Sequence, residues 1–181
     1  QDIGSWDVSA GSIFRYMFSR ADAFNQDISS WNVGSGSDFQ AMFYEADAFN
    51  QDIGNWDVSS GSDFSYMFYK AHAFNQDIGN WDVSSGTSLN AMFADAGAFN
   101  QNISNWDVSE TANLSDMFTD ADLMLSNLGF SATPTSADFN RTIFTEKTAL
   151  DTAVAEWIAN ETAATETYGD INTWDVRAIT D

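Results

Sequence analysis

Acidic and amide side chains recur every 25 residues in this chain of 181 and form rows that could bind a cation or a polar ligand. The middle position of the phrase Trp-Asp-Val holds Asp7, Asn32, Asp57, Asp82 and Asp107, and the position two residues earlier holds Asn55, Asn80 and Asn105 in the later units. Stacked units would bring such carboxylates to about 5 Å, where two of them repel by roughly 1 kcal/mol in water and more at a lower dielectric. The row therefore favours screening by salt or neutralisation by a cation.

Calcium is the metal that such carboxylates would suit, and Asp57 and Asp82 are its candidate ligands. Calcium takes about six to eight oxygens, however, and a flat column of single carboxylates supplies them poorly. We therefore expect no cofactor, with calcium as the weaker alternative.

Two further polar columns have structural interpretations. Acidic or amide residues at the return turn are predicted to cap nearby backbone N–H groups: Asp2, Asp27, Asp52, Asp77 and Asn102. A neighbouring column is predicted to hold buried amides bonded to the backbone of the next unit: Asn25, Asn50, Asn75 and Asn100.

Catalytic constellations are nearly absent, so the chain is predicted not to be an enzyme. His72 is the only histidine, and other units carry Asp or Gly at its position, which indicates a solvent-facing site. Tandem repetition also gives carboxylates similar surroundings, whereas two-carboxylate catalysis needs different ones. A hydrolase that uses paired Asp residues is therefore the weakest of the functional hypotheses for this chain.

Composition limits the partners and the class of protein. A net charge of −21 opposes approach to nucleic acids and to anionic membranes, and the sequence contains no apolar run long enough to insert in a bilayer. The 15% aromatic content indicates a folded chain in spite of that charge. With no cysteine, disulfides and thiolate metal sites are excluded.

The elements that would position these rows are predicted from the third unit. Trp56 and Val58 alternate with Asp57, as in a short strand with one buried face. Apolar residues then follow at i, i+3, i+4 and i+7, the stripe of a short amphipathic helix: Phe64, Met67, Phe68 and Ala71. The predicted fold class is an α/β repeat, a leucine-rich-repeat-like solenoid of short parallel strands and short helices with a C-terminal helical cap or linker. None of the repeated aromatic rings is expected on a solvent face.

The motifs that carry a family resemblance are Trp-Asp-Val-Ser, the Met-Phe pair and Ala-Phe-Asn-Gln-Asp-Ile. In these motifs the repeats resemble those of the BspA-like leucine-rich repeat surface proteins, over Gln1 to about Ala121. The turn departs from the usual wording, because Gly11, Gly36 and Gly61 stand where an apolar residue is commoner. The resemblance implies an extracellular or cell-surface location. It also implies a non-enzymatic adhesion module that binds a protein or glycan through a concave Asp/Asn/Ser face. The alternative is a structural spacer or a head-to-tail filament subunit that contacts copies of itself.

Four segments are expected: a five-unit repeat array over 1–121, an irregular connection or cap over 122–144, an amphipathic helix over 145–163, and the start of a further repeat over 164–181. Because Gln1 and Asp181 both fall inside a repeat phrase, we also expect either a longer native polypeptide or head-to-tail docking between molecules.

Overall fold

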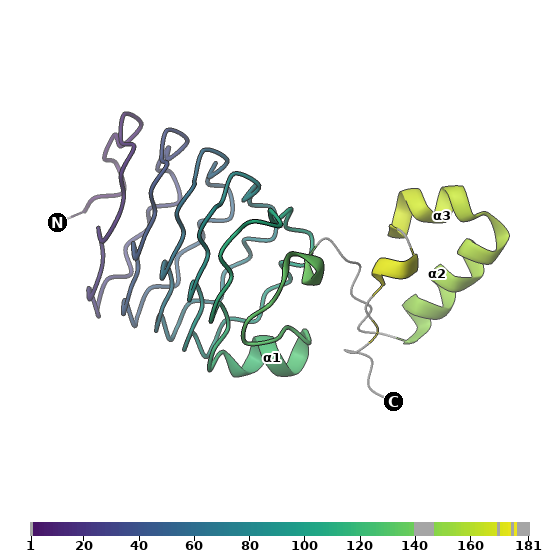
Figure 1. The fold of residues 1–181 in the computed structure, drawn as a ribbon. Coiled ribbons are helices and arrows are strands. Elements are labelled where there is room, and N and C mark those ends of the chain that lie inside the picture. The colour runs from purple at the N-terminus through teal and green to yellow at the C-terminus, as the bar shows by residue number, and fades with distance from the viewer. Residues whose placement is uncertain (1, 140–146, 170, 175, 177–181) are drawn as a thin grey trace.

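The computed structural model describes residues 2–139, 147–169, 171–174 and 176 (Figure 1). Its repeated part forms coils that lie one behind another in Figure 1, and isolated parallel bridges at 25-residue steps join Ile13, Asp38, Asp63, Ser88 and Asn113. The helical elements all follow this part: α1 (Asp122–Asn127), η1 (Ser136–Asp138), α2 (Lys147–Ala159), α3 (Glu161–Tyr168) and η2 (Ile171–Thr173).

The predicted α/β leucine-rich-repeat-like solenoid is wrong. Within the described residues the repeated units contain no α-helix and no regular strand, and the bridges between them are single. Each predicted helix is instead a run of β-turns, which we call the turn ladder (residues 13–20, 38–45, 63–70, 88–95 and 113–120). In the third coil, for example, the N–H groups of Met67 and Tyr69 bond to carbonyls three residues back, at 3.2 and 3.1 Å.

Left-handed residues are the physical reason for this difference. Tyr66 and Lys70 have φ angles of 58° and 55°, and the same two positions are left-handed in the other coils. A left-handed residue interrupts the α-helix, and for a residue with a Cβ it costs about 1–2 kcal/mol. In return, alternate N–H groups turn toward the next coil: those of Phe64, Tyr66 and Phe68 bond to the carbonyls of Ser88, Asn90 and Met92 at 2.8–3.0 Å.

The predicted strand segment is not where the coils pair through their backbones. Trp56 and Val58 are buried and Asp57 is exposed, so the side chains alternate as predicted. The Trp56 N–H, however, closes a turn onto the Ile53 carbonyl at 3.1 Å. The indole N–H of Trp56 reaches the neighbouring coil and donates to the Ile28 carbonyl at 3.2 Å. The predicted concave sheet face is therefore absent from the described residues.

Columns of identical side chains fill the core between the coils. The rings of Phe43, Phe68 and Phe93 follow one another at 5.6 Å with nearly parallel planes. Within a coil, Phe68 also stacks on Phe74 at 4.0 Å. A Cβ at Gly61 would lie 2.2 Å from the Phe64 ring, so the glycine that departs from the commoner repeat wording is needed where this ring packs under the turn.

The fifth coil is covered by the segment that follows it. The Phe118 N–H donates to the Ala132 carbonyl at 2.9 Å, and the Asp116 N–H donates to the Thr133 hydroxyl at 3.0 Å. The Phe130 ring lies 5.0 Å from that of Phe118. These contacts occupy the N–H groups that would otherwise point toward a sixth coil.

The C-terminal helices form a separate hairpin. Asn160 ends the first and caps the second, since its side chain accepts from the Ala163 N–H at 3.3 Å, so the region predicted as one helix is divided into α2 and α3. In the predicted further repeat, the Trp174 N–H bonds to the Ile171 carbonyl at 3.3 Å, as Trp56 does to Ile53. The parts of the predicted segments at 140–146, 170, 175 and 177–181 lie outside the described residues.

Candidate binding site

The predicted ligand row is exposed along its whole length, and the structure places its members at equivalent positions of successive coils: Asp7, Asn32, Asn55, Asp57, Asn80, Asp82, Asn105 and Asp107. The Asp57 Oδ1 atom accepts from the Ser59 N–H at 3.1 Å and from the Ser59 hydroxyl at 2.6 Å. Asp7 and Asp82 bond to Ser9 and Ser84 in the same way. One oxygen of each of these carboxylates therefore stabilises its own turn.

These hydrogen bonds lower the pKa of the carboxyl groups. The Ser59 hydroxyl, followed by its backbone N–H, holds the pKa of Asp57 below its ordinary value, and Ser84 does the same for Asp82. The charge of Asp57 slightly opposes the effect at Asp82, which places the two carboxylates in one electrostatic neighbourhood. Among the described residues, no group of three or more His, Cys, Asp or Glu side chains could hold a metal ion.

The return-turn column behaves as predicted. The amide column makes the predicted bonds but is not buried as predicted, because Asn25 is exposed and Asn50, Asn75 and Asn100 are only partly buried. At the return turn, the Asp52 and Asp77 carboxylates accept from the N–H groups of Gly54 and Gly79 at 3.0 and 2.9 Å. In the amide column, the Asn50 Oδ1 atom accepts from the Asn75 N–H at 2.9 Å. Both columns are therefore structural.

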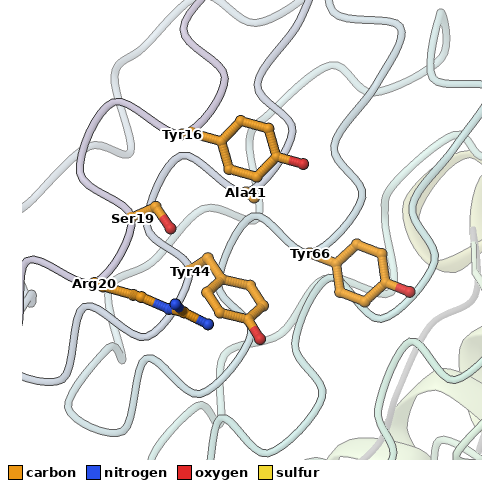
Figure 2. Close-up of a pocket in the computed structure, with 6 residues that line it drawn as sticks. All are labelled: Tyr16, Ser19, Arg20, Ala41, Tyr44 and Tyr66. Carbon is orange, nitrogen blue, oxygen red and sulfur yellow. The ribbon is translucent and has the colours of Figure 1, made fainter.

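The groove that sequence reasoning missed lies on the outer side of the turn ladder. Its lining residues, which we call the tyrosine groove, enclose about 520 Å³ and come from the first three coils (Figure 2): Tyr16, Ser19, Arg20, Ala41, Tyr44 and Tyr66. In Figure 2 the three phenolic oxygens point toward the same side, and the Arg20 guanidinium lies beside Tyr44. The groove offers aromatic surface with few charged groups.

The walls of the tyrosine groove follow from a large–small–large alternation at one repeat position. Tyr16, Ala41 and Tyr66 are equivalent residues of three successive coils, and all three are left-handed. Tyr16 and Tyr66 keep 55% and 39% of their surface exposed, whereas Ala41 between them keeps 2%. The alanine therefore forms the floor between two tyrosine walls.

Charged contacts fix the remaining side of the groove. Arg20 pairs with Glu45 at 3.1 Å, and its guanidinium lies 5.8 Å from the centre of the Tyr44 ring. Tyr44 also stacks on Tyr69 at 4.8 Å. Desolvation, followed by its hydrogen bond to Glu45, raises the pKa of the Tyr44 hydroxyl. The arrangement can bind an apolar or aromatic surface and donate hydrogen bonds to it.

Only a weak signal in the sequence could have found this groove. The position two residues after Phe14, Phe39, Phe64 and Leu89 alternates between Tyr and Ala in the first four ladder segments, at Tyr16, Ala41, Tyr66 and Ala91. Even in the predicted helix this position faces away from the apolar stripe. The exposed tyrosines are not repeated in every unit, so the 25-residue pattern does not single them out.

Comparison with protein families identifies the family to which the chain belongs. Residues 1–72 and 53–157 match the family described as "Mycoplasma protein of unknown function, DUF285". The chain belongs to this family. The two matched ranges overlap and include all five coils, so the DUF285 family model extends over the repeated part, its covering segment and most of α2. No curated protein and no solved structure matches the chain.

None of the helices in the described residues is both long and apolar enough to cross a bilayer.

Proposed function

We propose that this chain is a non-enzymatic binding module, displayed outside the cell or at its surface, that adheres to a protein or glycan partner. The observation that carries the proposal is the exposure of Tyr16 and Tyr66. Their equivalents in neighbouring coils are Ala41 and Ala91, which are buried, so the fold itself does not require a ring at this position. Exposed aromatic rings around a groove are the typical anchors of a binding surface. Display at the cell surface is supported only by the resemblance of the repeat motifs to those of the BspA-like surface proteins.

The predicted Asp/Asn/Ser row supports binding less well than the tyrosine groove. Its carboxylates hold their own turns, and it lacks an aromatic or arginine anchor among its members. A head-to-tail filament also has less support, because the N–H groups of Phe118 and Asp116 are already paired with the covering segment. Copies docking on the fifth coil would have to displace those contacts.

A pair of variants with precedents inside the chain tests the proposal. The full chain would be applied to cell surfaces, glycan arrays and protein arrays, alongside an unrelated protein of similar acidity. Tyr16→Ala combined with Tyr66→Ala should abolish binding, since Ala41 and Ala91 show that the coil accepts alanine there. Asp57→Asn combined with Asp82→Asn should leave binding unchanged, and Asn32 is the natural precedent for that change.

Two outcomes would oppose the proposal. Binding no stronger than that of the acidic control protein would argue against a binding module. Loss of binding in the Asp57 and Asp82 variant alone would move the site to the predicted row.

A further inference from the structure

We propose that the tyrosine groove binds an extended proline-rich peptide with basic residues beside the prolines. The inference rests on the proposed binding function and names the chemistry of its partner. Proline-rich segments adopt the polyproline II conformation, which is pre-ordered and docks in grooves lined by aromatic side chains.

The spacing of the walls fits one turn of that conformation. Phe14, Phe39 and Phe64 lie two residues before Tyr16, Ala41 and Tyr66, and their rings are separated by 5.5 Å at each step. Tyr16 and Tyr66 therefore stand two coil steps apart, or roughly 11 Å at the spacing of these rings. A polyproline II helix rises about 3.1 Å per residue with three residues per turn, or about 9 Å per turn. A peptide running along the stack would thus place a pyrrolidine ring above Ala41 and meet a tyrosine on either side.

The hydrogen-bonding groups of the groove suit the same ligand. A polyproline II segment has no internal hydrogen bonds, and proline has no N–H, so its carbonyls need donors from outside. The hydroxyls of Tyr16 and Tyr66 are donors on the exposed side of the groove (Figure 2). Tyrosine combines such a donor with a flat apolar face and has little conformational freedom to lose.

The charge of the chain favours basic residues on either side of the prolines. The chain carries −21 overall, and the basic residues on this face are each paired with an acid: Arg15 with Asp38, Arg20 with Glu45 and Lys70 with Asp95. An acidic peptide would therefore be repelled, whereas arginine or lysine next to the prolines would be attracted. A glycan is the less favoured ligand, because Ser19 and the tyrosine hydroxyls leave few polar groups to match its many hydroxyls.

The test uses the full chain and two labelled peptides. The first has about nine prolines, or three turns, between paired arginines, and the second replaces every proline by glycine. Fluorescence anisotropy should show binding of the proline peptide, and the glycine peptide should bind about tenfold more weakly or worse, because it lacks pre-ordered apolar contacts.

Matched variants locate the peptide. Ala41→Tyr fills the space between the walls, and Tyr16 and Tyr66 show that a tyrosine is compatible with this left-handed position. It should weaken binding of the proline peptide by about tenfold or more, as should Tyr66→Ala. Ala91→Tyr makes the same change on the far side of Tyr66, outside the groove, and should bind like the original chain. Thermal unfolding would show that each variant is folded.

Several results would overturn the inference. Equal binding of the two peptides would reduce the effect to charge, and equal binding by the Ala41→Tyr variant would remove it from the groove. If neither peptide binds while the chain still adheres to a surface partner, the proposed function stands and the peptide inference fails. If Ala41→Tyr abolishes binding to a glycan instead, the groove is a glycan site.

Discussion

The left-handed backbone at Asp95 predicts which of two substitutions the fold tolerates better. Asp95 has a φ of 61°, and its side chain makes an exposed ion pair with Lys70 at 3.8 Å, so removal of the side chain costs little. Glycine reaches this φ without a steric penalty, whereas the branched Cβ of valine clashes with the backbone. We expect Asp95→Gly to be more stable to unfolding than Asp95→Val by about 2 kcal/mol.

The predicted helix would give the opposite order. In a helix interior valine is better than glycine by about 0.4 kcal/mol, so the sign of the difference separates the two backbones. Urea unfolding of the full chain, followed by tryptophan fluorescence, measures it. Ser85, an exposed residue of the same coil without a positive φ, gives the control pair Ser85→Gly and Ser85→Val, in which glycine should have no advantage. Equal or greater stability of Asp95→Val would refute the turn ladder.

Three further predictions concern the core and the carboxylate row. Trp56→Ala should cost about 3–5 kcal/mol in the free energy of unfolding. Trp6→Ala should cost much less in the same urea experiment, because Trp6 is 51% exposed and Trp56 only 4%. Ser59→Ala should raise the pKa of Asp57 toward 3.8 in a titration followed by NMR, and the stabilisation that Asp57 contributes should be complete above that value and lost as the pH falls through its lower folded-state pKa. Sodium chloride should raise the melting temperature by screening, and calcium matched for ionic strength should raise it no further; a larger, saturating rise would show a metal site at Asp57 and Asp82.

The sequence could predict which side chains of a coil are buried, but not the backbone that buries them. Phe64, Met67, Phe68 and Ala71 are all buried, as the helical spacing indicated. A run of four-residue turns also brings positions i, i+3, i+4 and i+7 to one face, so the pattern does not distinguish the two backbones. A left-handed residue is usually signalled by glycine or asparagine, and here the position is held by residues such as Tyr66, which give no such signal.

The local roles of polar side chains could also be predicted, because an aspartate followed by Ser or Gly two residues later favours a bond to that backbone N–H, as at Asp52. The tyrosine groove depends instead on contacts between coils. Tyr16 and Tyr66 become walls only when the stack sets them on either side of Ala41, and no spacing within a single unit contains that information.

The turn ladder also gives the stack an electrical direction. Most bonds between the ladders of successive coils run from an N–H of one coil to a carbonyl of the next, as from Phe64 to Ser88, so these peptide dipoles of about 3.5 D each add as they do in a helix. Bonds of the opposite sense, such as that from the Ser62 N–H to the Ser37 carbonyl, cancel only part of the sum. The first coil is therefore the negative pole and the fifth coil the positive pole. The ionisable residues of the ladder match these poles: Arg15 and Arg20 lie in the first coil, and Asp116 and Asp120 lie in the fifth.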